Sequence, residues 1–580
     1  MMNNILDKIS NASDIKNLNS DELNSLCSEI RNCILTKVSK VGGHLGPNLG
    51  IVELTVALHY VFNSPKDKFV WDVSHQSYAH KILTGRKEAF QIEEKYKTVT
   101  GFTSPTESEH DFFTIGHTST SVSLASGLAK ARDIKGTKEN IVAIIGDGSL
   151  SGGEAFEGLD NVAEFKSNFI TIVNDNEMSI AENHGGIYGN LALLRKTNGT
   201  AEMNIFKALG FKYVYIEEGN NVNVLIEELK KIKDIDEPIV VHIHTLKGNG
   251  YSYASTYKEN FHWTPPFDIE TGKLIGVNSK ETYKKTVINH ITKKIDNDNR
   301  IVVINAAVPG ALDLCEFRES HPEKYFDVGI AEEHAIAFSS GLASQGMKPI
   351  AFFPSTFIQR TYDQISQDLC INNNPAVIIV EGAGLSGSDV THLGIFDIPM
   401  MSNIPNLVYL APTNKEEVTA MIDWALEQTD FPVAIRISSS QIKELNHKLS
   451  LKYELNKFEK VVEGEKIAII GLGNFFSLGE EVAEELKKKG INPTLINPRF
   501  ITGIDEEMLT SLLDSHNTVI TLEDGLLNGG FGEKIARFFG PTNMKVFNYG
   551  ANKEFTDSVP LNELYKRYHL TVDQIINDIL

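Results

Sequence analysis

Short apolar runs alternate with helical patterns along the whole chain of 580 residues. Two of the clearest apolar runs are residues 141–145 and 169–173, and residues 153–164 between them have the spacing of a helix. A strand–helix–strand unit of this length places its two strands parallel. Because parallel neighbouring strands end at the same edge of the sheet, the residues that follow these two strands are expected to lie together.

The same alternation divides the chain into three regions. We expect domains at residues 1–275, 276–445 and 456–580, with an irregular connection after the first and a polar, Lys-rich stretch after the second. Other strand candidates are residues 239–243, 301–304, 349–353, 376–380, 433–436 and 466–471. The pattern predicts an α/β protein with three parallel-sheet domains.

Composition narrows the class of protein. Hydrophobic residues make up 41% and charged residues 23%, which is typical of a soluble globular protein. The net charge of −21 disfavours nucleic acid and anionic membranes as partners. No apolar run reaches the ~18 residues that a membrane-spanning helix needs. The N-terminus lacks the pattern of a signal peptide, and four cysteines are too few for a disulfide framework. We therefore expect a cytoplasmic protein.

Two polar residues follow the paired strands. Asp147 lies in a Gly-Asp-Gly turn, and Asn176 lies in the turn after the second strand. A carboxylate and an amide oxygen beside Gly-rich turns suit Mg²⁺ or Ca²⁺ carrying a diphosphate. Taken alone, the same spacing also fits an ordinary pair of strand–helix turns.

Further segments match one family in the order in which they occur. The spacing of Asp147 and Asn176 resembles the metal–diphosphate motif of thiamine-diphosphate (ThDP) enzymes. From about residue 20 onward, the chain resembles the 1-deoxy-D-xylulose-5-phosphate synthase family. The matching segments are residues 42–45, 71–76, 116–121, 247–251, 261–262, 327–334, 355–360, 391–394 and 497–501. The resemblance implies a homodimer of the transketolase-like ThDP-binding type, with a diphosphate domain, a pyrimidine domain and a C-terminal domain.

The resemblance also implies which residues bind the cofactor and the metal. Asp147, Asn176 and the backbone carbonyl of Met178 would hold Mg²⁺. Glu332 would hydrogen-bond the pyrimidine ring and so start the loss of the reactive proton of ThDP. In isolation, Glu332 would be read as a solvated residue at a helix start. The other implied cofactor contacts are His75, His117, Thr118, Ser119, Gly148, Ser149, Tyr251 and Phe357.

The implied reaction joins pyruvate to an aldehyde. In this family pyruvate loses CO₂, and its two-carbon unit is transferred to D-glyceraldehyde 3-phosphate to give 1-deoxy-D-xylulose 5-phosphate. Carbanion chemistry near neutral pH needs proton donors and acceptors, which histidine supplies. A lone histidine is more often structural, but several in matching motifs favour catalysis. In addition to Glu332, the candidate catalytic residues are His44, His75, His262, His392 and Asp389.

Three positions depart from the family pattern. Members hold the acceptor phosphate with a tyrosine and two arginines, where this chain has Pro354, Gly382 and Ser439. Charge-assisted bonds to phosphate contribute about 1.5–3 kcal/mol each, so losing two would weaken acceptor binding by roughly two to four powers of ten. Arg360 or Arg436 would be the residues available to compensate. The stretch between residues 183 and 206 is also shorter than in the family.

Two alternatives to the family reaction remain open. One keeps the pyruvate half-reaction and uses a different, unphosphorylated aldehyde. The other is a ThDP-binding regulatory paralogue without turnover, but a protein that only binds ThDP would not need Glu332 or the three histidines of the first region. Transketolase and the E1 part of a 2-oxo-acid dehydrogenase fit the motifs less well.

Overall fold

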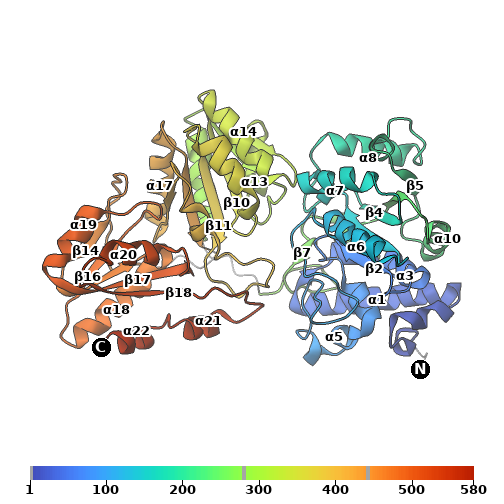
Figure 1. Ribbon diagram of the computed structural model, residues 1–580, viewed down its shortest axis with the longest axis horizontal. Coiled ribbons are helices and arrows are strands. Elements are labelled where there is room, and N and C mark those ends of the chain that lie inside the picture. The colour runs from blue at the N-terminus through green and yellow to red at the C-terminus, as the bar shows by residue number, and fades with distance from the viewer. Residues whose placement is uncertain (1–3, 277–281, 439–443) are drawn as a thin grey trace. The chain divides into compact units, whose positions relative to one another are not determined.

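The computed structural model describes residues 4–276, 282–438 and 444–580. It divides into two compact units. The first unit is Met1–Ser279 with Gly329–Ala331, and the second is Lys280–Val328 with Glu332–Leu580. Figure 1 labels many of their helices and strands.

The first unit is built on a five-stranded parallel sheet. Its strand order is β2-β3-β4-β6-β5. The strands are β2 (Lys68–Trp71), β3 (Ile141–Gly146), β4 (Phe169–Asp175), β5 (Lys212–Ile216) and β6 (Pro238–His244). Helix α7 (Gly153–Ala163) connects β3 to β4, so the strand–helix–strand unit expected from the sequence is confirmed.

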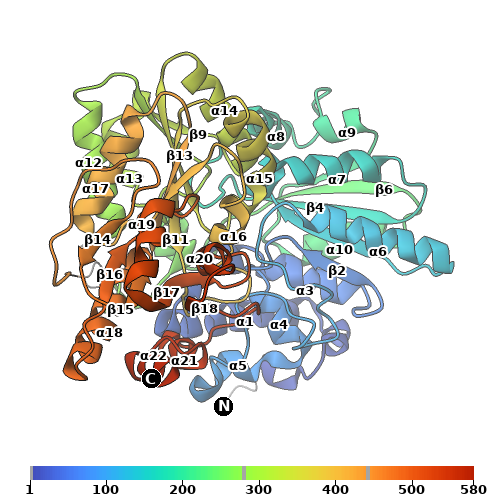
Figure 2. The same ribbon diagram turned by 60° about the vertical axis from the view of Figure 1, so that its left-hand side comes forward.

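Helices cover both faces of this sheet (Figures 1 and 2). Along β3, Val142 and Ile144 enter one hydrophobic core, while Ala143 and Ile145 enter the core on the opposite face. A strand buried on both faces has to be apolar throughout, which explains its continuous hydrophobic run. One face carries α1 (Ser20–Val41), α3 (Val52–Val61) and α10 (Val222–Ile232), and the other carries α6 (Ser121–Lys135), α7, α8 (Gly186–Lys196) and α9 (Ile205–Leu209).

A two-stranded antiparallel ribbon lies outside this sheet. It pairs β1 (Gly43–His44) with β7 (Trp263–Thr264), with Trp263 opposite His44. The ribbon therefore brings two segments together that are more than two hundred residues apart in sequence. The shorter helices of the unit are α2 (Gly46–Gly50), α4 (Tyr78–Lys81), α5 (Glu88–Gln91) and α11 (Ser252–Thr256).

The second unit contains two further sheets. The first is six-stranded and parallel, in the order β12-β13-β11-β10-β8-β9. Its strands are β8 (Ile301–Asn305), β9 (Tyr325–Asp327), β10 (Lys348–Pro354), β11 (Val377–Ala383), β12 (Val408–Leu410) and β13 (Val433–Ser438). The helices of this part are α12 (Tyr283–Ile295), α13 (Cys315–Ser320), α14 (Glu332–Ser344), α15 (Tyr362–Gln364), α16 (Asp397–Met401) and α17 (Lys415–Glu427).

The last sheet has five strands in the order β14-β16-β15-β17-β18. Its edge strand β14 (Glu459–Val462) runs antiparallel to β16 (Thr494–Asn497), and an antiparallel edge on a parallel sheet is common in α/β folds. The other strands, β15 (Lys466–Gly471), β17 (His516–Leu526) and β18 (Lys545–Ala551), are parallel. The helices are α18 (Phe476–Lys488), α19 (Glu506–Ser511), α20 (Phe531–Phe539), α21 (Leu561–Arg567) and α22 (Val572–Ile579). The fold is α/β with three main sheets, as expected.

Candidate functional site

Asp147 and Asn176 lie together at the carboxyl edge of the first sheet. Strands β3 and β4 end side by side, with the Asp147 N–H donating to the Asn174 carbonyl over 3.1 Å. The Asn176 N–H donates to Asp147 Oδ1 over 3.4 Å, and Asn183 Nδ2 donates to Asp147 Oδ2 over 2.7 Å. The topology thus brings two of the three predicted metal ligands together, and it adds Asn183, which the sequence pattern does not mark.

The charges around Asp147 fit a cation. Burial, with the carboxylate of Asp175 beside it, raises the pKa of Asp147 to about 7. The amide oxygens of Asn176 and Asn183 are buried and accept no hydrogen bond within the described residues. A carboxylate and amide oxygens that water does not reach are suitable ligands for Mg²⁺. In the described ranges, no cluster of three His, Cys, Asp or Glu side chains offers another metal site.

Asp175, the neighbouring carboxylate, is already compensated. It accepts hydrogen bonds from Arg195 of α8 and, over 2.8 Å, from Nε2 of His242. Although burial opposes ionisation, the bonds from His242 and Arg195 lower the pKa of Asp175. The ionised Asp175 therefore repels charge on Asp147, which leaves Asp147 as the carboxylate that gains most from a cation.

The turn after β3 is packed against the segments around it. A Cβ atom at Gly148 would lie 2.6 Å from the Cβ of Ser179, which follows Met178 in the loop after β4. A Cβ at Gly152 would lie 2.1 Å from Ser119 Oγ. Only glycine fits at these two positions, so the backbone N–H groups of this turn can approach a bound diphosphate closely.

Three of the predicted catalytic histidines form one cluster. The ring centroids of His44 and His75 are 4.9 Å apart, and those of His75 and His262 are 5.1 Å apart. The β1–β7 ribbon brings the segments of His44 and His262 together, with Leu45 N–H donating to the His262 carbonyl. Burial, with Lys247 and the other two rings nearby, holds the pKa of His262 well below its usual range. His262 is therefore a neutral imidazole.

The remaining predicted cofactor contacts of the first unit are partly engaged in the protein. The Ser119 N–H donates to the buried Asp72 over 2.8 Å, and Ser119 Oγ donates to the carbonyl of Ser149 over 2.8 Å. His117 and Thr118, just before Ser119, are half-buried. The Tyr251 hydroxyl donates to the Ile269 carbonyl over 2.9 Å, and its ring packs in an aromatic cluster. Burial raises the pKa of Tyr251 to about 12.

In the second unit, Glu332 begins helix α14 and is buried. Burial raises the pKa of Glu332, although Arg360 Nη1, 3.5 Å from its Oε2, opposes the shift. The interpretation of Glu332 as a solvated residue at a helix start is therefore wrong. A buried carboxyl group with a raised pKa retains a proton closer to neutral pH than an exposed glutamate does.

The other site candidates of the second unit lie close to one another. The rings of Phe357 and His392 meet edge to face, with centroids 5.7 Å apart. His392 Nδ1 lies 3.2 Å from Asp389 Oδ1. Burial opposes ionisation of Asp389, but the hydrogen bond with His392 lowers its pKa to about 2. The ionised Asp389 orients the imidazole next to Phe357.

Two of the three altered positions meet at one sheet edge. Pro354 at the end of β10 pairs with Glu381, directly before Gly382 on β11. Ser439 lies outside the described residues. Arg436 supplies no uncompensated positive charge to this edge, because its buried guanidinium binds Asp397 and Asp524. No local pattern in the sequence marked these two aspartates as its partners.

Three family descriptions cover most of the chain. Residues 6–204 and 194–245 match 1-deoxy-D-xylulose-5-phosphate synthase. Residues 280–444 match the pyrimidine binding domain of transketolase, and residues 456–575 match the transketolase C-terminal domain. The sheets and these matches define a transketolase-like protein.

Curated relatives show which family of transketolase-like proteins the chain belongs to. The 1-deoxy-D-xylulose-5-phosphate synthase of Caldanaerobacter subterraneus subsp. tengcongensis is 40% identical over 99% of this chain and 99% of its own. Those of Clostridium acetobutylicum and Geobacillus sp. are 38% and 39% identical, and each alignment covers at least 98% of both chains. Among solved structures, transketolase from Campylobacter jejuni aligns over 97% of this chain and 100% of that chain, with a TM-score of 0.45 and 18% identity. The chain belongs to the 1-deoxy-D-xylulose-5-phosphate synthase family.

No helix within the described residues is long and apolar enough to cross a membrane.

Proposed function

We propose that this chain decarboxylates pyruvate and transfers the two-carbon unit to D-glyceraldehyde 3-phosphate, giving 1-deoxy-D-xylulose 5-phosphate and CO₂. Full-length relatives of 37–40% identity that carry the synthase name support this reaction. The structural observation that carries the proposal is the pair Asp147 and Asn176 at the sheet edge, where the Asn176 N–H contacts Asp147 Oδ1 and the Asn176 amide oxygen is buried without a hydrogen bond in the described residues. Family membership implies ThDP as the cofactor.

Within the first unit, the metal and the diphosphate would be held by side-chain and backbone groups. Asp147, Asn176 and the carbonyl of Met178 would bind Mg²⁺, and the N–H groups of Gly148 and Ser149 would bind the diphosphate. Bound ThDP supplies a centre that stabilises a developing carbanion. The further contacts would come from His75, His117, Thr118, Ser119 and Tyr251.

Glu332 and Phe357 of the second unit would serve the pyrimidine ring of the cofactor. The raised pKa of Glu332 suits a carboxyl group that shares a proton with a ring nitrogen. Phe357 would offer its ring as a stacking surface.

The histidines would form hydrogen bonds with the substrate and transfer protons to or from it. The neutral His262, beside His44 and His75, can accept a hydrogen bond from a substrate hydroxyl, while its low pKa makes it a weak base. His392, oriented by Asp389, would donate or accept a proton within the second unit.

The alternatives from the sequence are less well supported. A different aldehyde acceptor and a regulatory paralogue are not favoured, since the full-length relatives carry the synthase name. Mg²⁺ as the metal, a homodimer and a cytoplasmic location remain predictions. Light scattering on the purified protein would measure the oligomeric state.

The deciding experiment measures CO₂ release by purified protein with ThDP, Mg²⁺ and pyruvate, with and without D-glyceraldehyde 3-phosphate. We expect CO₂ and 1-deoxy-D-xylulose 5-phosphate in equal amounts. Bound ThDP without CO₂ under any acceptor condition would remove the enzymatic proposal. Release of CO₂ with other aldehydes but not with D-glyceraldehyde 3-phosphate would show that the acceptor is a different aldehyde.

A further inference from the structure

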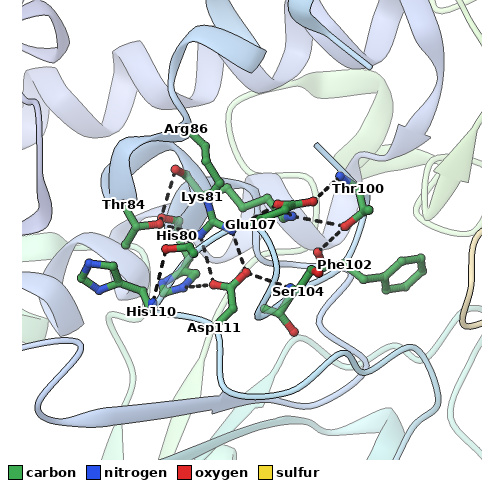
Figure 3. Close-up of polar contacts among 12 residues, drawn as sticks. His80, Lys81, Thr84, Arg86, Thr100, Phe102, Ser104, Glu107, His110 and Asp111 are labelled. Atoms are coloured by element: carbon green, nitrogen blue, oxygen red, sulfur yellow. Dashed lines mark hydrogen bonds and ion pairs between the residues drawn. The ribbon is translucent and has the colours of Figure 1, made fainter. Parts of the chain in front are cut away.

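A largely buried group of ionisable side chains lies in the first unit, and Figure 3 shows most of its polar contacts. We call it the loop clamp, and none of its members was singled out as a site residue. Four of them lie on α3, α4 and the helical turn that follows α4, and the other two are acids of the irregular segment 96–120. The members are His59, His80, Lys81, Arg86, Glu107 and Asp111.

Asp111 is the most highly bonded acid of the loop clamp. Its Oδ1 accepts from His80 Nε2 over 2.9 Å and from Arg86 Nη2 over 3.0 Å. Its Oδ2 accepts from Arg86 Nη1 over 2.6 Å and from the Ser104 N–H over 2.8 Å. The carboxylate of Asp111 thus makes a bidentate contact with Arg86 and also binds the backbone of its own loop. A bidentate contact fixes the orientation of both groups and pairs their charges.

Glu107 repeats this arrangement four residues earlier. Its Oε2 binds Lys81 Nζ and, over 3.2 Å, Arg86 Nη1. Its Oε1 accepts from the Thr100 N–H over 2.6 Å. Each acid therefore ties a backbone N–H of the segment to cations on the helical framework (Figure 3).

The two histidines orient the framework side of the clamp. Their rings stack with centroids 5.0 Å apart, and His59 Nε2 lies 2.9 Å from His80 Nδ1. Burial lowers the pKa of both imidazoles, so both are neutral. His59 then donates to His80, and His80 donates to Asp111. With neutral histidines, two acids balance Lys81 and Arg86, and no unbalanced charge is buried.

The segment that the clamp holds contains no helix or strand between residues 96 and 120. Irregular loops of this length in compact domains are usually functional. The segment ends in His117, Thr118 and Ser119. Ser74 also ties two points within it, since Ser74 Oγ donates to the Ile115 carbonyl and accepts from the Thr103 N–H.

We propose that Asp111 and Glu107 are positioning residues for cofactor binding. By anchoring residues 100–111 on Lys81 and Arg86, they fix the path of the chain into His117, Thr118 and Ser119 before ThDP arrives. This inference rests on the proposed function, because it takes these three residues as ThDP contacts. A loop already ordered in the unbound protein loses less conformational freedom on binding, and its ligand binds more tightly.

The test uses the full chain and measures ThDP binding directly. ThDP is titrated calorimetrically with Mg²⁺ present into wild type, Glu107→Gln and Asp111→Asn, and hydrogen exchange is followed in peptides spanning residues 96–120. We expect both variants to bind ThDP at least about 10-fold more weakly and to exchange faster in these peptides. Turnover at saturating ThDP should stay within about 3-fold of wild type, because neither acid is proposed to touch the cofactor.

Asp133→Asn is the matched control. Asp133 also binds an arginine and a serine, Arg132 and Ser167, but at the C-terminal end of α6. Its variant should lose some thermal stability and keep wild-type ThDP affinity. Glu107→Asp should recover part of the affinity that Glu107→Gln loses.

The outcomes separate this inference from the proposed reaction. Wild-type affinity in Glu107→Gln, or an equal loss in Asp133→Asn, would overturn the positioning role even if Asp111→Asn fails to fold. Failure of the wild type to bind ThDP would overturn both proposals. A wild type that binds ThDP without releasing CO₂, with the expected losses in the variants, would overturn only the reaction.

Discussion

Arg436 donates from Nε to Oδ2 of Asp397 over 2.6 Å, and both side chains are buried in the second unit. The guanidinium also binds Asp524 on β17, so it connects the six-stranded sheet to the C-terminal sheet. Two carboxylates compensate its single charge. Arg436 is therefore a structural ion-pair residue and not a substitute for the missing phosphate contacts.

Replacing Arg436 should reduce stability and leave acceptor binding unchanged. Arg436→Met leaves two buried aspartates uncompensated, and breaking a buried ion pair costs about 3–5 kcal/mol. Urea unfolding measures this loss. The control Arg300→Ala removes an exposed pair with Asp298, which should cost less than about 1 kcal/mol. A raised acceptor KM in Arg436→Met at unchanged stability would contradict the assignment.

Asp147→Asn should make the cofactor-free protein more stable while it abolishes Mg²⁺-dependent ThDP binding. A carboxyl group whose folded pKa is about 7 favours folding at low pH, and this stability is lost as pH rises from about 4 through 7. At pH 8 the neutral variant should gain about 2–4 kcal/mol in unfolding free energy. Calorimetry of ThDP binding and urea unfolding measure the two effects.

The contrasting variant is Asp175→Asn. The pKa of Asp175 is lowered, so its charge stabilises the folded state at neutral pH, and the variant should be less stable than wild type. A loss of stability in Asp147→Asn as large as that in Asp175→Asn would refute the cation-site interpretation of Asp147.

The sequence predicted those features that depend on local order along the chain. Strands β3 and β4 are buried on both faces and so appear as uninterrupted apolar runs, and Asp147 and Asn176 follow them directly. Contacts between distant segments had no such signal. Arg436 meets Asp524 across 88 residues, and Asp111 meets His80 across 31, through side chains that no periodic pattern marks.

Glu332→Ala should keep the cofactor and lose decarboxylation. The residue is buried with a raised pKa and lies 3.5 Å from Arg360 Nη1, so its removal deletes a proton-sharing group and one contact of Arg360. Proton transfer by a positioned side chain contributes about 10²–10⁴-fold to rate, and CO₂ release should fall by that order. The neighbouring Glu333→Ala should behave as wild type. Unchanged CO₂ release in Glu332→Ala, with ThDP bound, would refute its role.

Acid should destabilise the first unit through the histidines of the loop clamp. Burial lowers the folded pKa of His59 and His80 below the unfolded value of about 6.5. Their contribution to stability is therefore complete above pH 6.5 and is lost as pH falls toward the folded values. The slope is up to about 1.4 kcal/mol per pH unit for each group. Urea unfolding between pH 7 and 5 should show a smaller loss in His59→Gln than in wild type.

The phosphate group of the acceptor should raise kcat/KM less in this protein than in a site that binds it with two arginines. Pro354 and Gly382 offer no charge at the sheet edge, and Lys284, 3.7 Å from Glu381, is already paired. If two charge-assisted bonds are missing, the ratio of kcat/KM for D-glyceraldehyde 3-phosphate to kcat/KM for D-glyceraldehyde should be roughly 10²–10⁴-fold lower than in a site with two arginines. Steady-state kinetics with both aldehydes measures this ratio directly.

An arginine introduced at position 382 should restore part of the preference for a phosphorylated aldehyde. No atom lies within 4 Å of a Cβ built at Gly382, so Gly382→Arg meets no clash at its Cβ, although the φ of +70° there should cost about 1–2 kcal/mol in stability. The variant should prefer the phosphorylated aldehyde by an additional factor of about 10 or more. Gly382→Gln controls for bulk and backbone strain without adding charge. An equal preference in both variants would show that the phosphate is bound away from this edge, and that the substitutions at positions 354 and 382 left acceptor recognition unchanged.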